Sequence, residues 1–377
     1  MTQEHPLIVY RMAFAAIRGM GVELAQRILD VIPGEREFFN MPERELKSLT
    51  GSRSKMCERS YRDEMLRKAE DELHFVLDNN IKILYFTDDD YPRRLVNASD
   101  APILLYTIGD CNLNSKHMIS IVGTRRCTHY GLNFCDRLVE DLSRMLKDDV
   151  VVVSGLAYGT DINAHRAALK HNVPTVGVQA CGLNKIYPGE HRNDAAHIVQ
   201  QGGAIVSDYM SQDVIHRGNF LARNRIIAAL SDCTVVVESA DKGGSLVTAN
   251  IAASYDRDVF ALPGRVTDEF SKGCNRLIIN NQAAAITCAQ DLLKAMRWES
   301  REVPATGKEL ELFPQLTAEQ QSIVDILQRQ GDMHINDLAG LTATPIYRLM
   351  STLVELDAKG VITTLPGCRY ALSMRNA

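Results

Sequence analysis

Residues 150–169, VVVVSGLAYGTDINAHRAAL, decide the fold of this chain. The apolar run at 150–153 predicts a buried strand, and it stops at Ser154-Gly155, where a glycine-rich loop begins. Asp161 follows at a position that predicts a helix cap, and alanines then recur at helical spacing. A buried strand that leads through a small-residue loop into a helix forms an anion site, because backbone N–H groups and the helix dipole point at the ligand.

The same design occurs earlier in the chain. The apolar residues 118–122, MISIV, run directly into Gly123, Thr124, Arg125 and Arg126. Two such loops from one sheet, one of them with paired arginines, predict a polyphosphate ligand such as a nucleotide or a nucleic-acid backbone.

Apolar strands and helical stretches alternate throughout the middle of the chain. The expected strands are at 118–122, 150–154, 174–179, 204–207, 233–238 and 258–261. This alternation predicts an α/β fold with a parallel, doubly wound sheet, whose ligands bind at the carboxyl ends of the strands.

The flanking segments predict two further domains. Residues 1–85 are predicted to be helical, and the Gly19–Gly21 turn is typical of a helix–hairpin–helix or sterile-alpha-motif-like unit, or of a plain bundle with a glycine turn. The sheet domain is expected at 86–297 and a linker at 298–315. Residues 316–377 predict three helices and a β-hairpin, which together indicate a winged helix.

The presumed recognition helix of this winged helix has a mixed charge. It carries Arg348 and Lys359 as its basic residues, against Glu355 and Asp357. A protein contact or a structural role is therefore favoured over the reading of duplex DNA.

Composition limits the class of protein. The chain has 377 residues, of which 45% are hydrophobic, with a net charge of −5. No apolar run approaches the roughly 20 residues that span a membrane. Glu4, Arg11 and Arg18 interrupt the region where a signal peptide needs an apolar core, so we expect a cytoplasmic protein without membrane contact.

The nine cysteines are scattered and include no CxxC pair. This spacing disfavours a zinc site and a disulfide framework, and it predicts buried thiols in a reducing cytosol. We expect no metal and no cofactor.

The negative net charge does not exclude nucleic acid, because affinity for phosphates depends on local charge. Residues 216–225, HRGNFLARNR, contain Arg217, Arg223 and Arg225 with no acidic residue among them. This stretch is a candidate basic surface.

Several nucleotide-binding motifs are absent. Residues 123–126 do not match the GxGxxG pattern of dinucleotide folds, and GxxxxGK[ST] does not occur. Gly243, Gly244 and Ser245 follow a predicted strand and partly match the phosphate loop of lysine-decarboxylase-like nucleotide phosphoribohydrolases. Those enzymes place a catalytic Glu shortly after the loop, and here 249–252 read AlaAsnIleAla.

Six motifs in order give a more specific resemblance. They are IVGTRRCTHYG (121–131), VVSGLAYGTDINAHRAAL (152–169), CGLNKIYPGEHR (181–192), FLARNRIIAALSDCTVVVE (220–238), GGSLVTANIA (243–252) and VFALPGR…GCNRLI (259–278). The set resembles the DprA or Smf family of DNA-processing proteins of natural transformation, and the helical N-terminus and winged helix fit the layout of that family.

This resemblance implies a non-enzymatic protein with an extended Rossmann-like domain that binds single-stranded DNA, dimerises and helps to load RecA recombinase. The basic residues that it assigns to DNA are Arg125, Lys185, Arg192 and the triplet Arg223, Asn224 and Arg225. Departures from the family pattern are Asp208 in place of the usual Glu, Lys242-Gly243, and Asn281-Gln282-Ala283.

The expected contacts follow from the chemistry of the loops. We expect N–H groups at Gly123-Thr124 and at Ser154-Gly155 to bind individual phosphates. Phe220 or Tyr187 is a candidate for stacking on a base, although a buried role for Phe220 is favoured. Arg223 and Arg225 have an alternative as structural ligands of loop carbonyls.

Asp161 and His165 are expected to cap the helix and to order the loop rather than to catalyse a reaction. Three hypotheses remain open from the sequence: single-strand binding, hydrolysis of a nucleotide N-glycosidic bond, and a mainly protein-binding adaptor.

Overall fold

The computed structural model describes residues 5–51, 54–146, 149–300 and 316–373. The chain divides into one compact unit, Met1–Glu302, and a second, Val303–Ala377. Most of the predicted linker, residues 301–315, lies outside the described residues.

The first unit begins with a helical region. Its helices are α1 (Leu7–Ala15), α2 (Val22–Leu29), α3 (Glu35–Asn40), α4 (Glu43–Thr50), the short 3-10 helix η1 (Lys55–Cys57) and α5 (Arg59–Asp78). Phe14 and Phe38 pack edge to face with ring centroids 5.0 Å apart. The fully buried guanidinium of Arg62 donates to the carbonyls of Phe38, Phe39 and Met41, which fixes the chain between α3 and α4.

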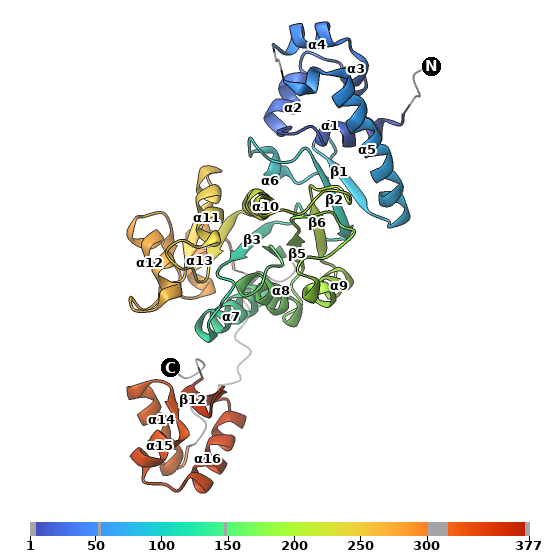
Figure 1. Cartoon of the computed structure of the whole chain (residues 1–377). Helices are drawn as coiled ribbons and strands as arrows, with labels where there is room; N and C mark the ends of the chain where they lie inside the picture. The colour runs from blue at the N-terminus through green and yellow to red at the C-terminus, as the bar shows by residue number, and fades with distance from the viewer. Residues whose placement is uncertain (1–4, 52–53, 147–148, 301–315, 374–377) are drawn as a thin grey trace. The chain divides into compact units, whose positions relative to one another are not determined.

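A nine-stranded sheet forms the centre of the first unit (Figure 1). Its order is β1-β2-β6-β5-β4-β3-β7-β8-β9. The strands are β1 (Lys82–Tyr85), β2 (Leu104–Gly109), β3 (His117–Val122), β4 (Val150–Ser154), β5 (Thr175–Val178), β6 (Ala204–Ser207), β7 (Cys233–Val236), β8 (Asp258–Ala261) and β9 (Ala284–Ala285). The strands from β6 to β9 in this order are parallel, whereas β1 and β2 are antiparallel to their neighbours.

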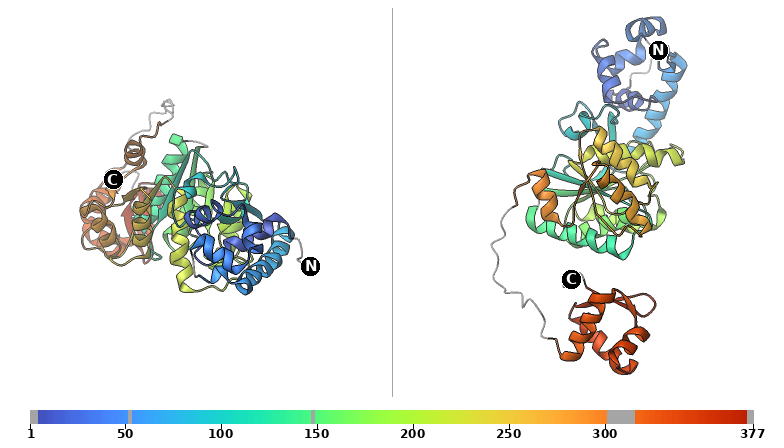
Figure 2. Two further views of the ribbon diagram at one scale, coloured as in Figure 1. Left: turned by 90° about the horizontal axis from the view of Figure 1, so that it is seen from above. Right: turned by 90° about the vertical axis from the view of Figure 1, so that its left-hand side faces the viewer.

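Helices cover both faces of the sheet (Figures 1 and 2). They are α6 (Arg93–Val96), α7 (His129–Leu146), α8 (Thr160–Lys170), η3 (Gly189–His191), α9 (Arg192–Gln200), α10 (Arg217–Leu230), α11 (Gly244–Ser254), η4 (Glu269–Ser271), α12 (Lys272–Ile279) and α13 (Ala289–Met296). Ile119 and Ile121 of β3 join the core under α7, α8 and α13, whereas Met118 and Val122 join the core under α10 and α11. Among the described residues, no helix is long and apolar enough to cross a membrane.

The strand order locates a crevice. The chain proceeds from β3 through β4 and β5 to β6 on one side, and then returns to place β7 on the other side of β3. In doubly wound sheets, ligands bind outside the carboxyl ends of the strands at the point where the order reverses. This point lies between β3 and β7.

All six strands expected from the sequence are present, and the prediction of a doubly wound α/β sheet is confirmed. The sequence did not indicate β1, β2 or β9, nor the antiparallel edge. β1 ends at Tyr85, so this strand of the sheet lies within the range 1–85 that was expected to be helical.

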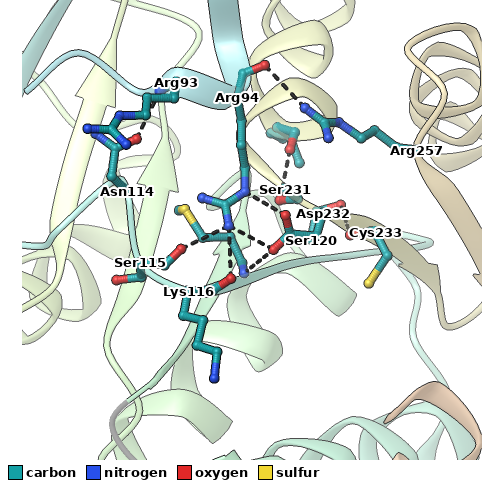
Figure 3. Close-up of polar contacts among 12 residues, drawn as sticks. Arg93, Arg94, Asn114, Ser115, Lys116, Ser120, Ser231, Asp232, Cys233 and Arg257 are labelled. Carbon is teal, nitrogen blue, oxygen red and sulfur yellow. Dashed lines mark hydrogen bonds and ion pairs between the residues drawn. The ribbon is translucent and has the colours of Figure 1, made fainter. Parts of the chain in front are cut away.

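A polar cluster lies at the amino-terminal end of β3, which is the end opposite to the crevice (Figure 3). Arg94 donates to both carboxylate oxygens of Asp232, at 2.6 and 2.9 Å, and to the carbonyls of Ser115 and Lys116. Asp232 also accepts the backbone N–H of Met118 at 2.8 Å. These contacts serve the packing of the sheet and lie away from the crevice.

The second unit is a winged helix. It contains α14 (Ala318–Gln330), β10 (Met333–His334), α15 (Ile335–Thr342), α16 (Ile346–Ala358), β11 (Ile362–Leu365) and β12 (Arg369–Leu372), with strand order β10-β12-β11. Thr317 and Gln320 form a capping box at the start of α14. Leu338, Leu349 and Leu353 fill the core, as the predicted periodicity requires.

Candidate nucleic-acid interface

A cleft with a volume of 340 Å³ opens at the carboxyl ends of β3 and β7. It is lined by the loop that follows β3, by Ala157 and Asp161 from the segment after β4, by one face of α10, and by the loop and first turn of α11. Of the predicted site residues, those that line it are Gly123, Thr124, Arg125, Phe220, Arg223, Asn224, Gly244 and Ser245. The cleft therefore coincides with the crevice that the strand order locates.

Two exposed cations stand in this cleft. Arg125 lies in the loop after β3, and Arg217 is the first residue of α10. Within the described part of the chain, neither side chain has a hydrogen-bond or ion-pair partner. Arg125 lies close enough to Asp161 to act on the pKa of its carboxyl group. Both guanidinium groups are thus available to a bound anion.

The start of α11 supplies neutral donors to the same cleft. Gly243 occupies the N-cap and offers no side chain to the first N–H groups of the helix. The Ser245 hydroxyl is buried and has no hydrogen-bond partner, and Ser245 is only 6% exposed. A side chain added at Gly244 would meet no atom within 4 Å, so the approach to this helix end is open. The arrangement suits a phosphate group.

Two buried groups of opposite charge, Arg223 and Asp161, lie beneath the cleft. The Arg223 side chain, 4% exposed, donates to the carbonyl of Gly155 at 2.6 Å and to that of Val178. The Asp161 carboxylate accepts N–H groups from Gly155 and Ala157. A Cβ added to Gly155 would lie 2.6 Å from both Arg223 Nη1 and Asp161 Oδ2, so this position requires glycine.

This arrangement corrects two expectations. Arg223 was expected to contact DNA, but its side chain is buried and its Nη1 donates to carbonyls at the ends of β4 and β5. Asp161 was expected to cap α8, but Gly159 occupies the N-cap and Asp161 lies within the first turn. Burial raises the pKa of Asp161, and the charge of Arg223 opposes that shift.

Three expected phosphate ligands are engaged within the protein. The Asp161 carboxylate already occupies the Gly155 N–H. The Ser154 hydroxyl is buried and donates to the carbonyl of Ile121 at 2.7 Å. The Thr124 N–H donates to the carbonyl of Glu238 at 2.7 Å. An intramolecular carboxylate thus takes the place that the sequence assigned to a phosphate at the end of β4.

Arg225 is also a structural residue. Its guanidinium pairs with Asp208 at 2.5 Å and donates to the carbonyl of Asp100 at 2.6 Å. Asp208 is the residue that departs from the family pattern, and it retains the carboxylate that Arg225 needs. Arg225 lines a different cleft from the one that holds Arg125.

The remaining predicted cations lie outside the cleft lining. Arg126 is exposed in the loop beside Arg125, Lys185 is half-buried in the loop after β5, and Arg192 is exposed at the first position of α9. All three follow the carboxyl end of a strand. None of the three lines the cleft.

The two aromatic candidates lie together. The rings of Tyr187 and Phe220 have centroids 5.1 Å apart at an angle of 55°. Phe220 is half-buried and lines the cleft, whereas Tyr187 is 47% exposed. The structure therefore joins residues that the sequence offered as alternatives.

Sequence reasoning quoted Arg217 but did not assign it to the site. Residues 217, 220, 221 and 224 all line the cleft, and their spacing places them on one face of α10. Helical spacing from Phe220 and Asn224 was the signal that could have found Arg217.

His165 is a structural residue with a consequence for pH dependence. It is fully buried, and its Nδ1 lies 2.7 Å from the Thr175 hydroxyl in β5 rather than in the loop. Burial lowers the pKa of His165 to about 3. No group of three or more His, Cys, Asp or Glu side chains suited to a metal ion occurs within the described ranges.

We expect His165 to make the protein less stable as the pH falls below about 6.5, where the unfolded histidine takes up a proton that the folded one excludes. Its full contribution is present above that pH and is lost progressively toward the folded pKa. Thermal unfolding between neutral pH and about pH 4.5 should show a shallower decline for His165→Gln than for the wild type. If the unfolding temperature falls by the same amount with pH in the wild type and in His165→Gln, this assignment is contradicted.

A family model described as DNA recombination-mediator protein A matches residues 82–297, which is more than half of the chain. The chain belongs to this family. A second model, described as the DprA winged helix domain, matches residues 309–368.

Individual relatives agree. Protein Smf of Escherichia coli is 32% identical over 279 residues, which cover 74% of each chain. The X-ray structure of DNA processing protein A from Streptococcus pneumoniae superposes with a TM-score of 0.63 at 28% identity, covering 78% of this chain and 98% of that one. A structure of the Helicobacter pylori protein, described for its single-stranded DNA binding mode, has 32% identity, a TM-score of 0.49, and coverage of 58% and 95%. The chain is a DNA-processing protein of the DprA or Smf family.

Proposed function

We propose that this chain binds single-stranded DNA through the cleft at the ends of β3 and β7. In the cytoplasm it protects the incoming strand and loads RecA recombinase onto it during natural transformation. RecA and a second copy of the chain are the protein partners, as the family resemblance implies.

One observation carries the DNA-binding part of this proposal. Arg125 and Arg217 project into a cleft that also contains the uncapped start of α11 and the unpartnered Ser245 hydroxyl. Guanidinium groups, helix N-terminal N–H groups and a hydroxyl are the donors that bind phosphate oxygens in nucleic-acid complexes. The phosphate oxygens of a single-stranded nucleic acid can accept hydrogen bonds from all of these donors.

The size of the cleft supports a single strand. Its volume of 340 Å³ lies at the small end of the range for ligand pockets, which is roughly 300–1,000 Å³. Such a cleft accommodates a nucleotide unit of one strand but not the two strands of a duplex. Because the donors address the backbone, binding should be independent of sequence and should weaken steeply with salt.

The hydrolase alternative lacks a free general base. Among the described residues that line the cleft, Asp161 carries the one carboxylate and is the one acidic candidate for a general base. This carboxylate accepts N–H groups from Gly155 and Ala157 and lies beside Arg223, so it is held by the protein. A binding role is therefore better supported than hydrolysis of an N-glycosidic bond.

The winged helix favours a protein contact. Its α16 exposes Tyr347 at 75% and Val354 at 66%, and Lys359 donates to the Gln320 side chain at 3.1 Å. An exposed apolar helix face with few free cations is unsuited to a phosphate backbone. Capture of RecA by the full chain and by a variant lacking 316–377 should show whether this unit contributes to the partner surface.

The proposed function is tested by competition. Labelled oligo-dT bound to the full chain should be displaced by unlabelled oligo-dT but not by duplex of equal length, and the bound strand should resist an exonuclease. Release of free base from nucleoside monophosphates by purified chain would instead favour the hydrolase. Equal displacement by single strands and duplex would contradict the proposal.

A further inference from the structure

The structure assigns a second function to two exposed tyrosines. We propose that Tyr158 and Tyr187, together with Phe220, form a base-stacking strip that carries the DNA strand out of the cleft toward α9. This inference rests on the proposed binding of single-stranded DNA and adds the direction in which the strand leaves.

Ring contacts define the strip. Phe220 lines the cleft, and its ring centroid lies 5.1 Å from that of Tyr187. Four residues further along the same loop, His191 packs edge to face against Tyr158 at 5.0 Å. The loop after β5 thus joins the two aromatic contacts into one path from the cleft across the end of β4.

The tyrosines of the strip present ring surface to solvent. Tyr158 is 44% exposed and Tyr187 is 47% exposed, whereas Phe220 is half-buried and His191 is 4% exposed. Exposing the apolar surface of a large aromatic ring to water is energetically unfavourable. In a chain with only 6% aromatic residues, the clustering of such rings at one edge is unusual. Successive aromatic faces beside a cationic groove are the surface on which nucleobases stack.

The charges beside the strip fit a phosphate backbone. Lys185 precedes Tyr187 in the loop, and Arg192 is exposed at the start of α9. The exposed Glu190 accepts a hydrogen bond from the Tyr158 hydroxyl, which orients that ring, and Arg192 follows it closely. These two cations were predicted to bind DNA but do not line the cleft. The strip gives Lys185 and Arg192 a role in DNA binding outside the cleft.

The other side of the cleft is a poorer exit. There the loop after β7 carries Asp241, whose carboxylate pairs with Arg276 at 2.5 Å. The pair neutralises Arg276, whereas Lys242 in the same loop is exposed and keeps its charge. The stacking surface, rather than charge, therefore favours the direction along the ends of β4 and β5.

The test measures affinity as a function of strand length for the full chain. For wild type, affinity should rise when oligo-dT becomes longer than the cleft holds. For Tyr158→Ala/Tyr187→Ala, this rise should be smaller by about thirtyfold for each ring, the middle of the range for one stacked base. Tyr158→Phe/Tyr187→Phe keeps both rings and should retain the rise. Tyr347→Ala removes an exposed tyrosine of the second unit and should change nothing.

Abasic strands of equal length and charge separate stacking from charge. Wild type should lose the length-dependent gain on abasic strands, and the double alanine variant should bind normal and abasic strands alike. The proposed strip is contradicted if the alanine variant keeps the wild-type dependence of affinity on strand length. It is also contradicted if the variant loses the same factor in affinity, relative to wild type, on abasic strands or on the shortest oligo-dT. If wild type binds no single strand of any length, the proposed function itself fails.

Discussion

Replacing Arg223 by alanine is expected to lower the free energy of unfolding by about 3 to 5 kcal/mol, the usual cost of removing one partner from a buried charge pair. Arg223 is 4% exposed, so water cannot replace it. Its loss leaves the Asp161 carboxylate without its buried cation, with only the exposed Arg125 nearby, and removes the Arg223 donor from the carbonyls of Gly155 and Val178. Denaturant unfolding should show a lower midpoint with an unchanged slope.

Two companion variants make this result specific. Asn224→Ala changes the next residue of α10, which is half-buried, and should change stability by less than about 1 kcal/mol. Asp161→Asn combined with Arg223→Met removes both charges and should cost less than the sum of the single changes, because no charge is left unpaired. An unfolding midpoint equal to that of the wild type for Arg223→Ala would refute the structural role.

Removing both exposed arginines of the cleft should weaken single-strand binding by at least about a hundredfold. Each hydrogen bond to a charged group contributes about 1.5 to 3 kcal/mol, and Arg125 and Arg217 together supply at least two. Both side chains are exposed, so Arg125→Ala/Arg217→Ala should unfold at nearly the wild-type midpoint. Fluorescence anisotropy with labelled oligo-dT measures the loss.

A control with the same change of net charge separates local contact from general electrostatics. Arg144 and Lys170 are exposed on α7 and α8, which cover the opposite face of the sheet from α10. Arg144→Ala/Lys170→Ala should leave affinity within a few-fold of the wild type. If both double variants lose affinity equally, the cleft is not the binding site.

The parallel sheet could be predicted because its signals are local. Apolar runs that end in Gly-, Ser- or Asp-rich loops mark β3 to β8, and the periodicity of 318–359 marks the helices of the winged helix. β9 escaped prediction because it has only two residues. β1 has four residues, as β5 to β8 do, but it begins with the exposed Lys82 and does not form a fully apolar run. Their pairing depends on distant segments that the sequence does not bring together.

The role of Arg223 could not be read from charge alone. Residues 216–225 contain no acidic residue, which predicted a basic surface, but Asp161 supplies a negative charge to Arg223 from a distant segment. Helical periodicity could have predicted that Arg223 is buried, because it lies on the same face of α10 as Ile226, Ile227 and Leu230. The same pattern places Arg217 on the face that lines the cleft.

The anion-binding loops show a similar limit. A glycine loop before a helix predicts free N–H groups, but the sequence does not reveal whether the protein fills them. At the end of β4 they are filled by Asp161, whereas the start of α11 is left uncapped. Both loops first recognised line the cleft, but the loop after β3 contributes an exposed cation, Arg125, whereas the segment after β4 contributes the buried carboxylate of Asp161.

The salt dependence of oligo-dT binding tests the central claim most directly. The slope of log affinity against log salt should be steep for wild type and shallower by about 1.4 for Arg125→Ala/Arg217→Ala, since each phosphate contact on a single strand contributes about 0.7. Duplex of equal length should bind more weakly at every salt concentration. Equal slopes for the two proteins, or equal affinity for duplex and single strand, would contradict the cleft as a single-strand binding site.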